Sequence, residues 1–505
     1  MPTTQPFRSK QKQRVSKKIT IPSALGGWNA RDNLDAMQAT DAVVMDNWIA
    51  RESYLELRNG YTKKVTIPNA VETLLSYKVA SNPKLLGAYN GNISELDLGA
   101  DSTNILASGY NSNQWQDILY KDRIFACNGV DTPFVYDGST VGATGFTGSG
   151  LTLTNLVNAT QFKNRLFFIE AGTLKFWHTN AAGNITGTLL EFDLSQFSKL
   201  GGELICVDTW GQNDSQIVFI TSEGETFVYS GTDPADATNW YLRGIYTIPK
   251  PLGYRSTQQL AGDLIVITQD GYFPLSRVLP LDESNKAVAF SDKISGAVQD
   301  LQTRFNSFGW QIKLYSKAGY LIINVPYKSN EFRQHIMNTV TGAWSQFTGQ
   351  NASCFENFND NLYFGGRNGN VYQADSGTTD DGALIDGYIQ QAYSNYGSLD
   401  VKHFKEVSTI ISTELDLVQN VFFGVDFKDA KKAFSSSPVS TGGLWNTFLW
   451  NTTFWSIGGT PTTRRIPLIA DIGYKGSIGI KTQSSQGDLK WYSSVVVFET
   501  GTGLK

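Results

Sequence analysis

Histidine, cysteine and charged residues are all scarce in this chain of 505 residues. It has three histidines and three cysteines, and only 17% of its residues are charged. The cysteines, Cys127, Cys206 and Cys354, are odd in number and far apart, which argues against a disulfide framework or a cysteine-based metal site. We therefore expect three small, buried apolar side chains.

The chain also lacks an excess of one charge and any long apolar run. Its formal net charge is −4, so no overall basic field would attract nucleic acid or an anionic membrane. No run of 18 or more apolar residues occurs, which predicts that no segment spans a membrane. The N-terminus has no apolar core of a signal peptide, which argues against secretion by that route.

Recognisable catalytic patterns are missing as well. His178, His335 and His403 stand in no metal-binding motif, and no glycine-rich phosphate loop precedes a helix. Several acidic residues fall where hairpins are expected to turn, and these are Asp137, Asp263, Asp270 and Asp360. Glycoside chemistry needs two convergent carboxylates, and a sequence alone does not exclude such convergence. The sequence predicts a protein that is not an enzyme, with no catalytic residue, no metal ligand and no cofactor.

What the chain has in quantity is glycine and aromatic residues. Glycine occurs 48 times, about one residue in ten, and aromatic residues reach 12%. Together with the low charge, this favours an all-β protein with many turns. The length indicates two or three domains.

A repeat runs from residue 70 to residue 376. Its core is an apolar strand followed by a turn with Gly, Asn or Asp, and successive copies start 39 to 57 residues apart. The first core residues are Leu85, Ile124, Leu166, Ile217, Leu264, Leu321 and Leu362. Such a period is typical of propeller blades, so the sequence predicts a β-propeller of about seven blades. A large sandwich with irregular hairpins is the alternative.

One insertion in the repeat carries the best helix signal. Ser291 is placed to cap a helix, and Ile294, Val298, Leu301 and Phe305 recur at helical spacing. We expect a surface helix there, packed either on its own blade or on a neighbouring subunit or domain.

A segment dense in backbone-fixing residues lies before the repeat, within residues 21–69. We interpret it as a structural clamp made of a loop, a short helix over Ala42–Trp48 and an edge strand from Leu55 to Arg58. Its expected key residues are Gly26, Gly27, Asn29, Arg31, Asp32, Asp46, Asn47 and Trp48.

Residues 1–20 are polar and basic. Six positive charges fall within eleven residues: Arg8, Lys10, Lys12, Arg14, Lys17 and Lys18. The segment has no periodicity, so we expect a disordered basic arm. It could bind a partner surface, contact DNA phosphates, or be a plain solvated tail.

After residue 376 the repeat period is lost. Residues 377–382 read as a linker, and residues 377–505 predict an appended C-terminal β-sandwich. Trp445, Trp450 and Trp455 recur at a step of five, which matches neither a strand nor a helix. We interpret them as a packed aromatic seam, with a sugar-stacking platform as the alternative.

Both ends of the chain resemble one family. The opening Gly26-Gly27-x-Asn29-x-Arg31-Asp32, with Asp46-Asn47-Trp48 and Arg58-Asn59-Gly60-Tyr61, is similar to that of β-propeller tail nozzle proteins of short-tailed bacteriophages. The stretch Leu444–Trp455 resembles the repeated Trp-Asp-Thr ribbon near the end of such proteins, with Asn446 and Asn451 in place of the commoner Asp.

This resemblance implies a structural virion protein. Such a protein forms a homo-oligomeric ring, most simply a hexamer, at the distal end of the tail tube, and its channel passes DNA during ejection. Its partners would be other phage tail proteins, namely tube, adaptor and fibres, with no sequence-specific nucleic-acid binding and no membrane span. It would be made in the host bacterial cytoplasm and reside in the virion. A head-completion or receptor-binding component is the alternative within the virion, and a propeller glycan hydrolase or lyase is the alternative from another class.

Overall fold

The computed structural model describes residues 15–79, 82–278, 289–304, 308–412, 418–428, 433–436, 462–484 and 489–500. The expected all-β class is confirmed, with 55% strand and 5% helix. The chain forms two compact units. Unit 1 combines Met1–Arg58 with Gly382–Lys505, and unit 2 is Asn59–Asp381. None of the helices in the described ranges is long and apolar enough to cross a membrane.

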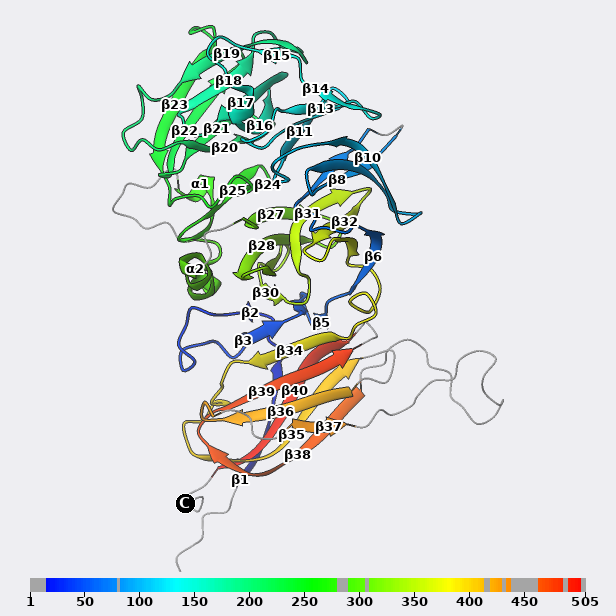
Figure 1. The fold of residues 1–505 in the computed structure, drawn as a ribbon. Helices are drawn as coiled ribbons and strands as arrows, with labels where there is room; N and C mark the ends of the chain where they lie inside the picture. The colour runs from blue at the N-terminus through cyan, green and yellow to red at the C-terminus, as the bar shows by residue number, and fades with distance from the viewer. Residues whose placement is uncertain are drawn as a thin grey trace, which may run out of the picture. The chain divides into compact units, whose positions relative to one another are not determined.

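Four small sheets fill the first half of unit 2, each from strands that are consecutive in the chain (Figure 1). They are β7 (Thr73–Tyr77), β8 (Lys84–Tyr89), β9 (Asn92–Asp97) and β10 (Ser102–Ser108); β11 (Gln116–Tyr120), β12 (Arg123–Cys127), β13 (Phe134–Tyr136) and β14 (Val141–Ala143); β15 (Phe146–Thr147), β16 (Leu156–Phe162), β17 (Arg165–Glu170), β18 (Lys175–Thr179) and β19 (Gly187–Asp193); β20 (Leu204–Trp210), β21 (Gln216–Thr221), β22 (Glu225–Gly231) and β23 (Trp240–Thr247). Neighbouring strands pair antiparallel, except that β15 joins β19 in parallel.

Three further groups of paired strands complete the described part of unit 2. They are β24 (Thr257–Leu260), β25 (Asp263–Thr268) and β26 (Gly271–Pro274); β27 (Gln311–Tyr315), β28 (Tyr320–Lys328), β29 (Glu331–Asn338) and β30 (Trp344–Phe347); β31 (Ala352–Phe358), β32 (Asn361–Gly366) and β33 (Asn370–Ala374) with β6 (Tyr61–Thr66). β6 comes from the opposite end of the unit's sequence and pairs antiparallel with β33. The first and last strands of unit 2 therefore meet in one sheet.

The predicted helix lies between β26 and β27. The structure forms α1 (Leu275–Val278), the 3₁₀ turn η2 (Asp292–Ile294) and α2 (Ser295–Arg304), with Val298 and Leu301 buried. The Ser291 hydroxyl does not cap this helix, because it accepts a hydrogen bond from the Tyr272 N–H.

The sequence repeat corresponds to the second strand of each group in chain order, except in the β15–β19 group, where it corresponds to β17, and in the group completed by β6, where it corresponds to β32. The seven predicted core residues fall in β8, β12, β17, β21, β25, β28 and β32. These strands are almost wholly buried because a sheet covers each of their faces, which explains their continuous apolar runs.

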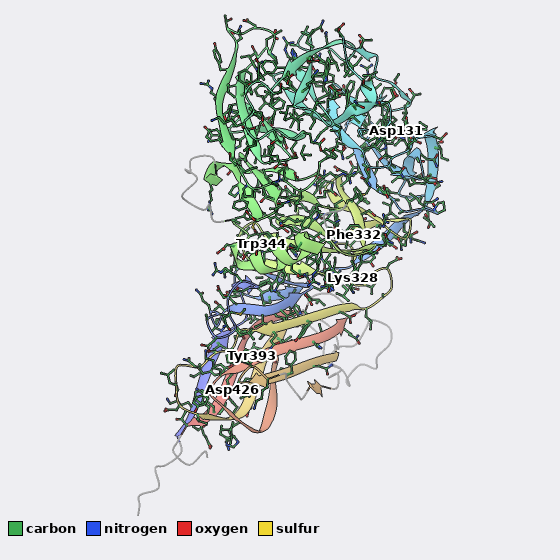
Figure 2. The ribbon with its side chains drawn as sticks, turned by 60° about the vertical axis from the view of Figure 1, so that its left-hand side comes forward. Asp131, Lys328, Phe332, Trp344, Tyr393 and Asp426 are labelled. Atoms are coloured by element: carbon green, nitrogen blue, oxygen red, sulfur yellow. The ribbon has the colours of Figure 1, made fainter. Side chains whose placement is uncertain are left out.

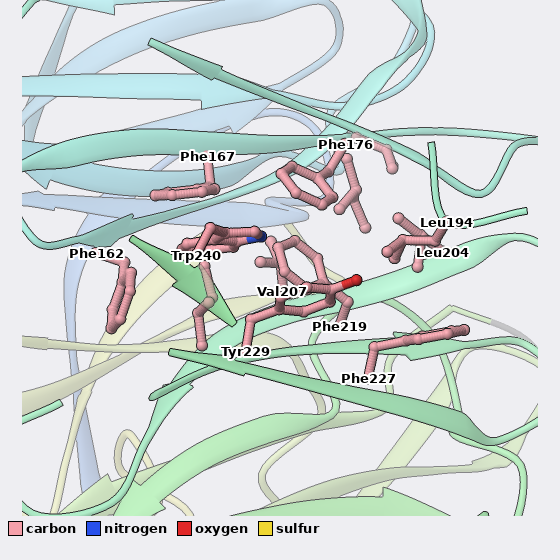
Figure 3. Packing of buried hydrophobic residues seen from close by; sticks show 13 residues of the cluster. Phe162, Phe167, Phe176, Leu194, Leu204, Val207, Phe219, Phe227, Tyr229 and Trp240 are labelled. Atoms are coloured by element: carbon pink, nitrogen blue, oxygen red, sulfur yellow. The ribbon is translucent and has the colours of Figure 1, made fainter. Parts of the chain in front are cut away.

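Consecutive sheets of unit 2 pack face to face. Between the β16–β19 and β20–β23 sheets, the Phe176 and Phe219 rings stack with centroids 4.3 Å apart, and Tyr229 stacks on Trp240 (Figure 3). Asp131, labelled in Figure 2, accepts a backbone hydrogen bond from Asn111 in the connection between the first two sheets.

The last sheet of unit 2 packs on the first. Val65 of β6 and Cys354 of β31 share one apolar cluster with Leu74 and Leu85 of the first sheet. The series of sheets is thus closed by apolar contact as well as by the β6–β33 pairing.

Unit 1 draws strands from both ends of the chain. One sheet holds β38 (Thr462–Gly473), β35 (Lys402–Ser412), β40 (Lys490–Thr500), β5 (Leu55–Leu57) and β4 (Trp48–Ala50), with β1 (Val15–Pro22) along β40; the second series holds β2 (Gly27–Trp28), β3 (Asp41–Asp46), β34 (Ile385–Gln391), β39 (Gly476–Ser484), β36 (Val418–Val425) and β37 (Ala433–Ser436). Phe404 of β35 packs on Phe423 of β36 with centroids 4.9 Å apart, so the two series share an apolar contact.

Two local predictions are wrong. The expected helix over Ala42–Trp48 is instead β3 and β4, because Ala42 to Asp46 pair with β34 and Asn47 turns the chain at a φ of 62°. The expected disorder of residues 1–20 fails for its last six residues, since Val15–Pro22 is the strand β1.

The boundaries of the units also differ from the expected domains. The segment 21–69 is divided after Arg58, because β6 belongs to unit 2. Unit 2 ends at Asp381 rather than residue 376, and its last residues are tied to its first: the Tyr61 N–H donates to the Thr379 carbonyl, and the Asp381 N–H donates to the Tyr61 carbonyl.

Candidate functional site

The first half of the expected clamp is a polar network around Asn29, which is buried. The Asn29 amide donates to Asp41 at 2.8 Å and to Asp32 at 2.9 Å, and its oxygen accepts the N–H groups of Arg31 and Asp32. Arg31 also pairs with Asp32 at 2.7 Å. A Cβ at Gly26 would lie 2.4 Å from an Asp41 carboxylate oxygen, so only glycine fits there. The network fixes the loop that leads into β3.

The second half of the clamp centres on Asn47 and Arg58. The Arg58 guanidinium, almost fully buried, donates to the Asn47 amide oxygen at 2.8 Å, and the Asn47 amide donates to the Asp386 carbonyl at 2.8 Å. Asp46 ends β3 opposite Tyr388, and the Trp48 ring is fully buried at the start of β4. These bonds join the N-terminal strands to β34.

Gly27, the remaining clamp residue, begins β2 at a φ of 78°. The structure thus divides the eight clamp residues between two networks of backbone-fixing contacts in unit 1. The sequence does not indicate that Arg58 is buried, because the alternation over Leu55–Arg58 does not show which neighbour covers its side chain.

The other predicted site residues are placed only in part. Lys17 and Lys18 lie in β1 with exposed side chains. Arg8, Lys10, Lys12 and Arg14 lie outside the described residues, as do the three tryptophans of the expected seam, Trp445, Trp450 and Trp455.

A cavity of about 510 Å³ occupies the middle of unit 2. One strand of every group contributes to its wall, and these strands are β7, β11, β16, β20, β24, β27 and β31. These strands also contact one another in series, with β11 next to β16, β16 next to β20, and β27 next to β31. We call this space the central cavity.

Amide side chains at the central cavity link neighbouring sheets. Gln311 of β27 donates to the Phe355 carbonyl at 3.0 Å and accepts the Phe355 N–H at 2.8 Å. Asn158 of β16 donates to the Tyr254 carbonyl at 3.1 Å. Such bonds satisfy buried polar groups where no sheet hydrogen bond is available.

Arg255 also links separate sheets, through its charged side chain. Its guanidinium donates to the carbonyls of Glu72 and Trp115, each at 3.0 Å, and to the Thr73 hydroxyl at 2.5 Å. It therefore joins the turn before β24 to the first two sheets. Burial lowers its pKa from the usual value, although nearby acidic groups partly offset this.

A second charged group of the central cavity is built on Glu356 of β31. Its carboxylate lies 2.5 Å from the Lys313 ammonium and 3.5 Å from the Lys78 ammonium. Burial acts to lower the pKa of Lys313, but the attraction of Glu356 outweighs it, so that pKa is raised. Glu356 is thus in contact with two lysine side chains.

Three further carboxylates at the central cavity, those of Asp117, Asp208 and Asp214, have no cation in contact among the described residues. Asp117 of β11 forms no hydrogen bond or ion pair with any residue in the described ranges, and burial, followed by repulsion from Glu356, raises its pKa. Asp208 of β20 accepts the Thr209 N–H at 2.8 Å and the Thr257 hydroxyl, and burial raises its pKa to about 6.

The sequence did not reveal these charged residues of the central cavity, because the acidic residues that it singled out lie in expected turns. The available signal was a charged residue inside an otherwise apolar strand: Asp117 in β11, Asp208 in β20, Lys313 in β27 and Glu356 in β31. A strand buried on both faces carries a charge only where it meets a polar space or a partner.

The cysteines and two of the three histidines are buried. All three cysteines are free and buried, as expected. His178 is buried in β18, and His335 is buried with its Nδ1 2.8 Å from the Tyr272 hydroxyl. Within the described ranges, no three His, Cys, Asp or Glu side chains are grouped as a metal ion would need.

Comparison with known proteins adds no assignment: no protein-family model matches the chain, and no curated protein matches it.

Proposed function

We propose that unit 2 is a seven-bladed β-propeller and that unit 1 is a β-sandwich built from both chain ends. The propeller proposal is supported by seven consecutive groups of paired strands, each of which contributes one strand to the wall of the same cavity. It is also supported by β6, which completes the last sheet with a strand from the start of the unit. Such closure leaves no open end in the ring of blades.

We further propose that the chain is a structural protein of a short-tailed bacteriophage tail. It forms a homo-oligomeric ring, a hexamer, at the distal end of the tail tube, and DNA passes through the ring's channel. The observation that carries this proposal is that the chain ends join in one folded unit. The segment with the resemblance, Gly26 to Trp48, contributes β2, β3 and β4 to the same unit as β40.

The chemistry of the clamp agrees with a structural role. Asn29, Asp32 and Asn47 bond to their own loop or to neighbouring strands, and Arg58 is buried on Asn47. Groups engaged in this way orient backbone and are not available to react with a substrate.

Quantitative mass spectrometry of purified phage particles tests the proposal. We expect the chain in mature particles at about six copies for each tail, a number that the resemblance implies. A chain that is made during infection but absent from purified particles would contradict it. One copy for each fibre would instead favour a receptor-binding component.

The central cavity favours one second candidate, a propeller glycan hydrolase or lyase. Asp117 and Glu356 both line this cavity, and a carboxyl group with a raised pKa can serve as a general acid. Against this, two lysines pair with Glu356.

An assay with host surface polysaccharide and peptidoglycan separates the two candidates. We expect no turnover from the purified protein. Reproducible turnover that is lost in Asp117→Asn, and retained in Asp122→Asn in the turn after the same strand, would replace the structural proposal with the enzymatic one.

A further inference from the structure

Four large apolar side chains are exposed at one end of unit 1. Leu399 lies in the loop before β35, Phe427 in the turn after β36, and Ile472 and Tyr474 where β38 leads into β39. Their exposed fractions are 84%, 42%, 48% and 56% in that order. We call these four residues the apolar tip. Exposed apolar side chains gathered in this way mark a surface that contacts a partner.

Polar contacts bring the segments of the apolar tip together. The Lys402 ammonium donates to the carbonyls of Ser398, Asp400 and Tyr474, which joins the first loop to the turn after β38. The Asp426 carboxylate, labelled in Figure 2, accepts the N–H groups of Tyr474 and Lys475 at 2.8 and 2.9 Å. These contacts use backbone atoms of the turns, so the exposed Leu399 and Tyr474 side chains are not needed to hold them.

Strand β1 begins at the same end of unit 1. Val15 lies opposite Thr500 of β40, Thr500 lies opposite Lys402, and Lys402 lies opposite Gly473 of β38. Residues 1–14 therefore join the described part of the chain beside the apolar tip.

This end of unit 1 has an excess of positive charge. The loops of the tip are balanced, with three cations and three carboxylates: Lys402, Lys428 and Lys475, and Asp35, Asp400 and Asp426. The excess comes from β1, where Lys17 and Lys18 are exposed, and from residues 1–14, which contain four cations and no acidic residue: Arg8, Lys10, Lys12 and Arg14.

The combination favours an anionic lipid surface as the partner. Apolar and aromatic side chains enter the boundary between headgroups and acyl chains, and nearby cations are attracted to anionic headgroups. Nucleic acid would use the cations but leave the apolar side chains in water. A second protein is less suited, because side chains exposed to this extent present on the order of 500 Å², below the ~800 Å² that each partner buries in a stable interface.

We propose that this end of unit 1 binds the surface of a bilayer that contains anionic lipids. The apolar tip enters the interface, and Lys17, Lys18 and the cations of residues 1–14 pair with headgroup phosphates. The net charge of −4 does not oppose this binding, because salt screens charges farther than about 8 Å from the surface. The inference concerns unit 1 alone and does not depend on the place of the protein in a virion.

Flotation of the full chain with lipid vesicles tests the proposal. The vesicles contain either phosphatidylcholine alone or phosphatidylcholine and phosphatidylglycerol in a ratio of three to one, in 0.1 M NaCl. We expect the chain to float with the anionic vesicles, and to bind the neutral vesicles at least tenfold more weakly. In 0.5 M NaCl, binding to the anionic vesicles should fall at least tenfold, because salt screens the headgroup charge.

Two changes separate the apolar from the charged contribution. Leu399→Ser combined with Tyr474→Ser should weaken binding to anionic vesicles at least tenfold, and so should deletion of residues 1–14, which leaves β1 intact. The matched control combines Val340→Ser with Ile105→Ser, at two side chains of unit 2 that are 71% and 56% exposed. It should bind as the unmodified chain does, and thermal unfolding checks that every variant is folded.

Three results would overturn the proposal. Equal binding to neutral and anionic vesicles would show that lipid charge is not recognised. Unchanged binding after the changes at Leu399 and Tyr474, or an equal loss in the control, would show that the apolar tip is not the site. If the chain binds no vesicles but self-associates in analytical ultracentrifugation, and the tip variant abolishes that association, a second copy covers the tip instead.

Discussion

At the scale of single residues, buried polar side chains hold loops and sheets together. The clearest case in unit 1 is Lys402 of β35, whose side chain is fully buried. Its ammonium donates to the carbonyls of Ser398, Asp400 and Tyr474 at 2.6, 3.0 and 2.7 Å. Asp426, labelled in Figure 2, accepts the N–H groups of Tyr474 and Lys475 nearby. Two turns of unit 1 thus depend on one charged side chain.

Lys402→Met should destabilise unit 1 by about 2–3 kcal/mol. Methionine keeps the volume but leaves the carbonyl groups of Ser398, Asp400 and Tyr474 without this donor. Lys405→Met, on the same strand, is the matched control: Lys405 is partly exposed and lies 3.5 Å from Glu499, so we expect less than ~1 kcal/mol. Urea unfolding measures both changes, and equal losses would contradict the role given to Lys402.

Asp208→Asn should stabilise unit 2 at pH 8 and have little effect at pH 4. In the folded protein burial raises the pKa of Asp208 to about 6, above the unfolded value of 3.8. The folded protein therefore has its full stability below pH 3.8, where Asp208 is neutral in both states, and loses part of it as the pH rises through 6. An asparagine at this position carries no charge, so Asp208→Asn should restore at most ~3 kcal/mol of unfolding free energy at pH 8.

Asp137→Asn is the control of opposite sign. Hydrogen bonds from the Thr140 and Ser139 N–H groups lower the pKa of Asp137 to about 2, so its contribution is present at pH 8 and lost as the pH falls through 2. Thermal unfolding at pH 4 and pH 8 measures the Asp208 variant, and thermal unfolding at pH 2 and pH 8 measures the Asp137 variant. A stabilisation by Asp208→Asn that is the same at both pH values would contradict the assignment.

At the scale of elements, pairing between distant strands determines the secondary structure where the local sequence is compatible with either a helix or a strand. Val43 and Val44 lie in a segment that could be capped as a helix, yet pairing with β34 makes it a strand. The seven apolar runs were predictable because each is buried on both faces and keeps its pattern in the sequence. Strand β1 was not, because its charged side chains point to solvent and only its backbone pairs with β40.

Removal of residues 1–22 should lower the stability of unit 1, whereas removal of residues 1–14 should not. The longer deletion takes away the whole of β1, which pairs with β40 from Val15 opposite Thr500 to Pro22 opposite Ser493. The shorter one leaves that strand intact. Hydrogen exchange should show faster exchange of β40 amides only in the longer deletion, and equal exchange in both would mean that β1 does not protect β40.

At the scale of the whole molecule, the chain crosses between its units twice, at Arg58–Asn59 and at Asp381–Gly382. The repeat period ends at residue 376, and the second crossing follows at Asp381–Gly382. The sequence did not predict the first crossing, because no local pattern separates β6 from the segments on either side. Only its pairing with β33 assigns β6 to unit 2. Likewise, the central cavity joins residues from seven distant strands, and no local pattern predicts which of them converge.

The fragment 59–381 should fold alone and unfold in one cooperative transition. It contains every described strand of the seven groups, including β6. The fragment 70–376, cut at the boundaries expected from sequence, lacks β6 and exposes the edge of β33, so it should melt at a lower temperature. Circular dichroism melting compares the two, and equal midpoints would show that β6 does not close the unit.

The central claim is that this chain is a ring-forming component at the distal end of a short phage tail. Cryo-electron microscopy of intact particles tests it most directly, because the fold of both units can be located in the density. We expect several copies, six in the simplest case, arranged around the tail axis at the tip of the tube. Density for the two units at the neck, on peripheral fibres, or nowhere in the particle would contradict the account.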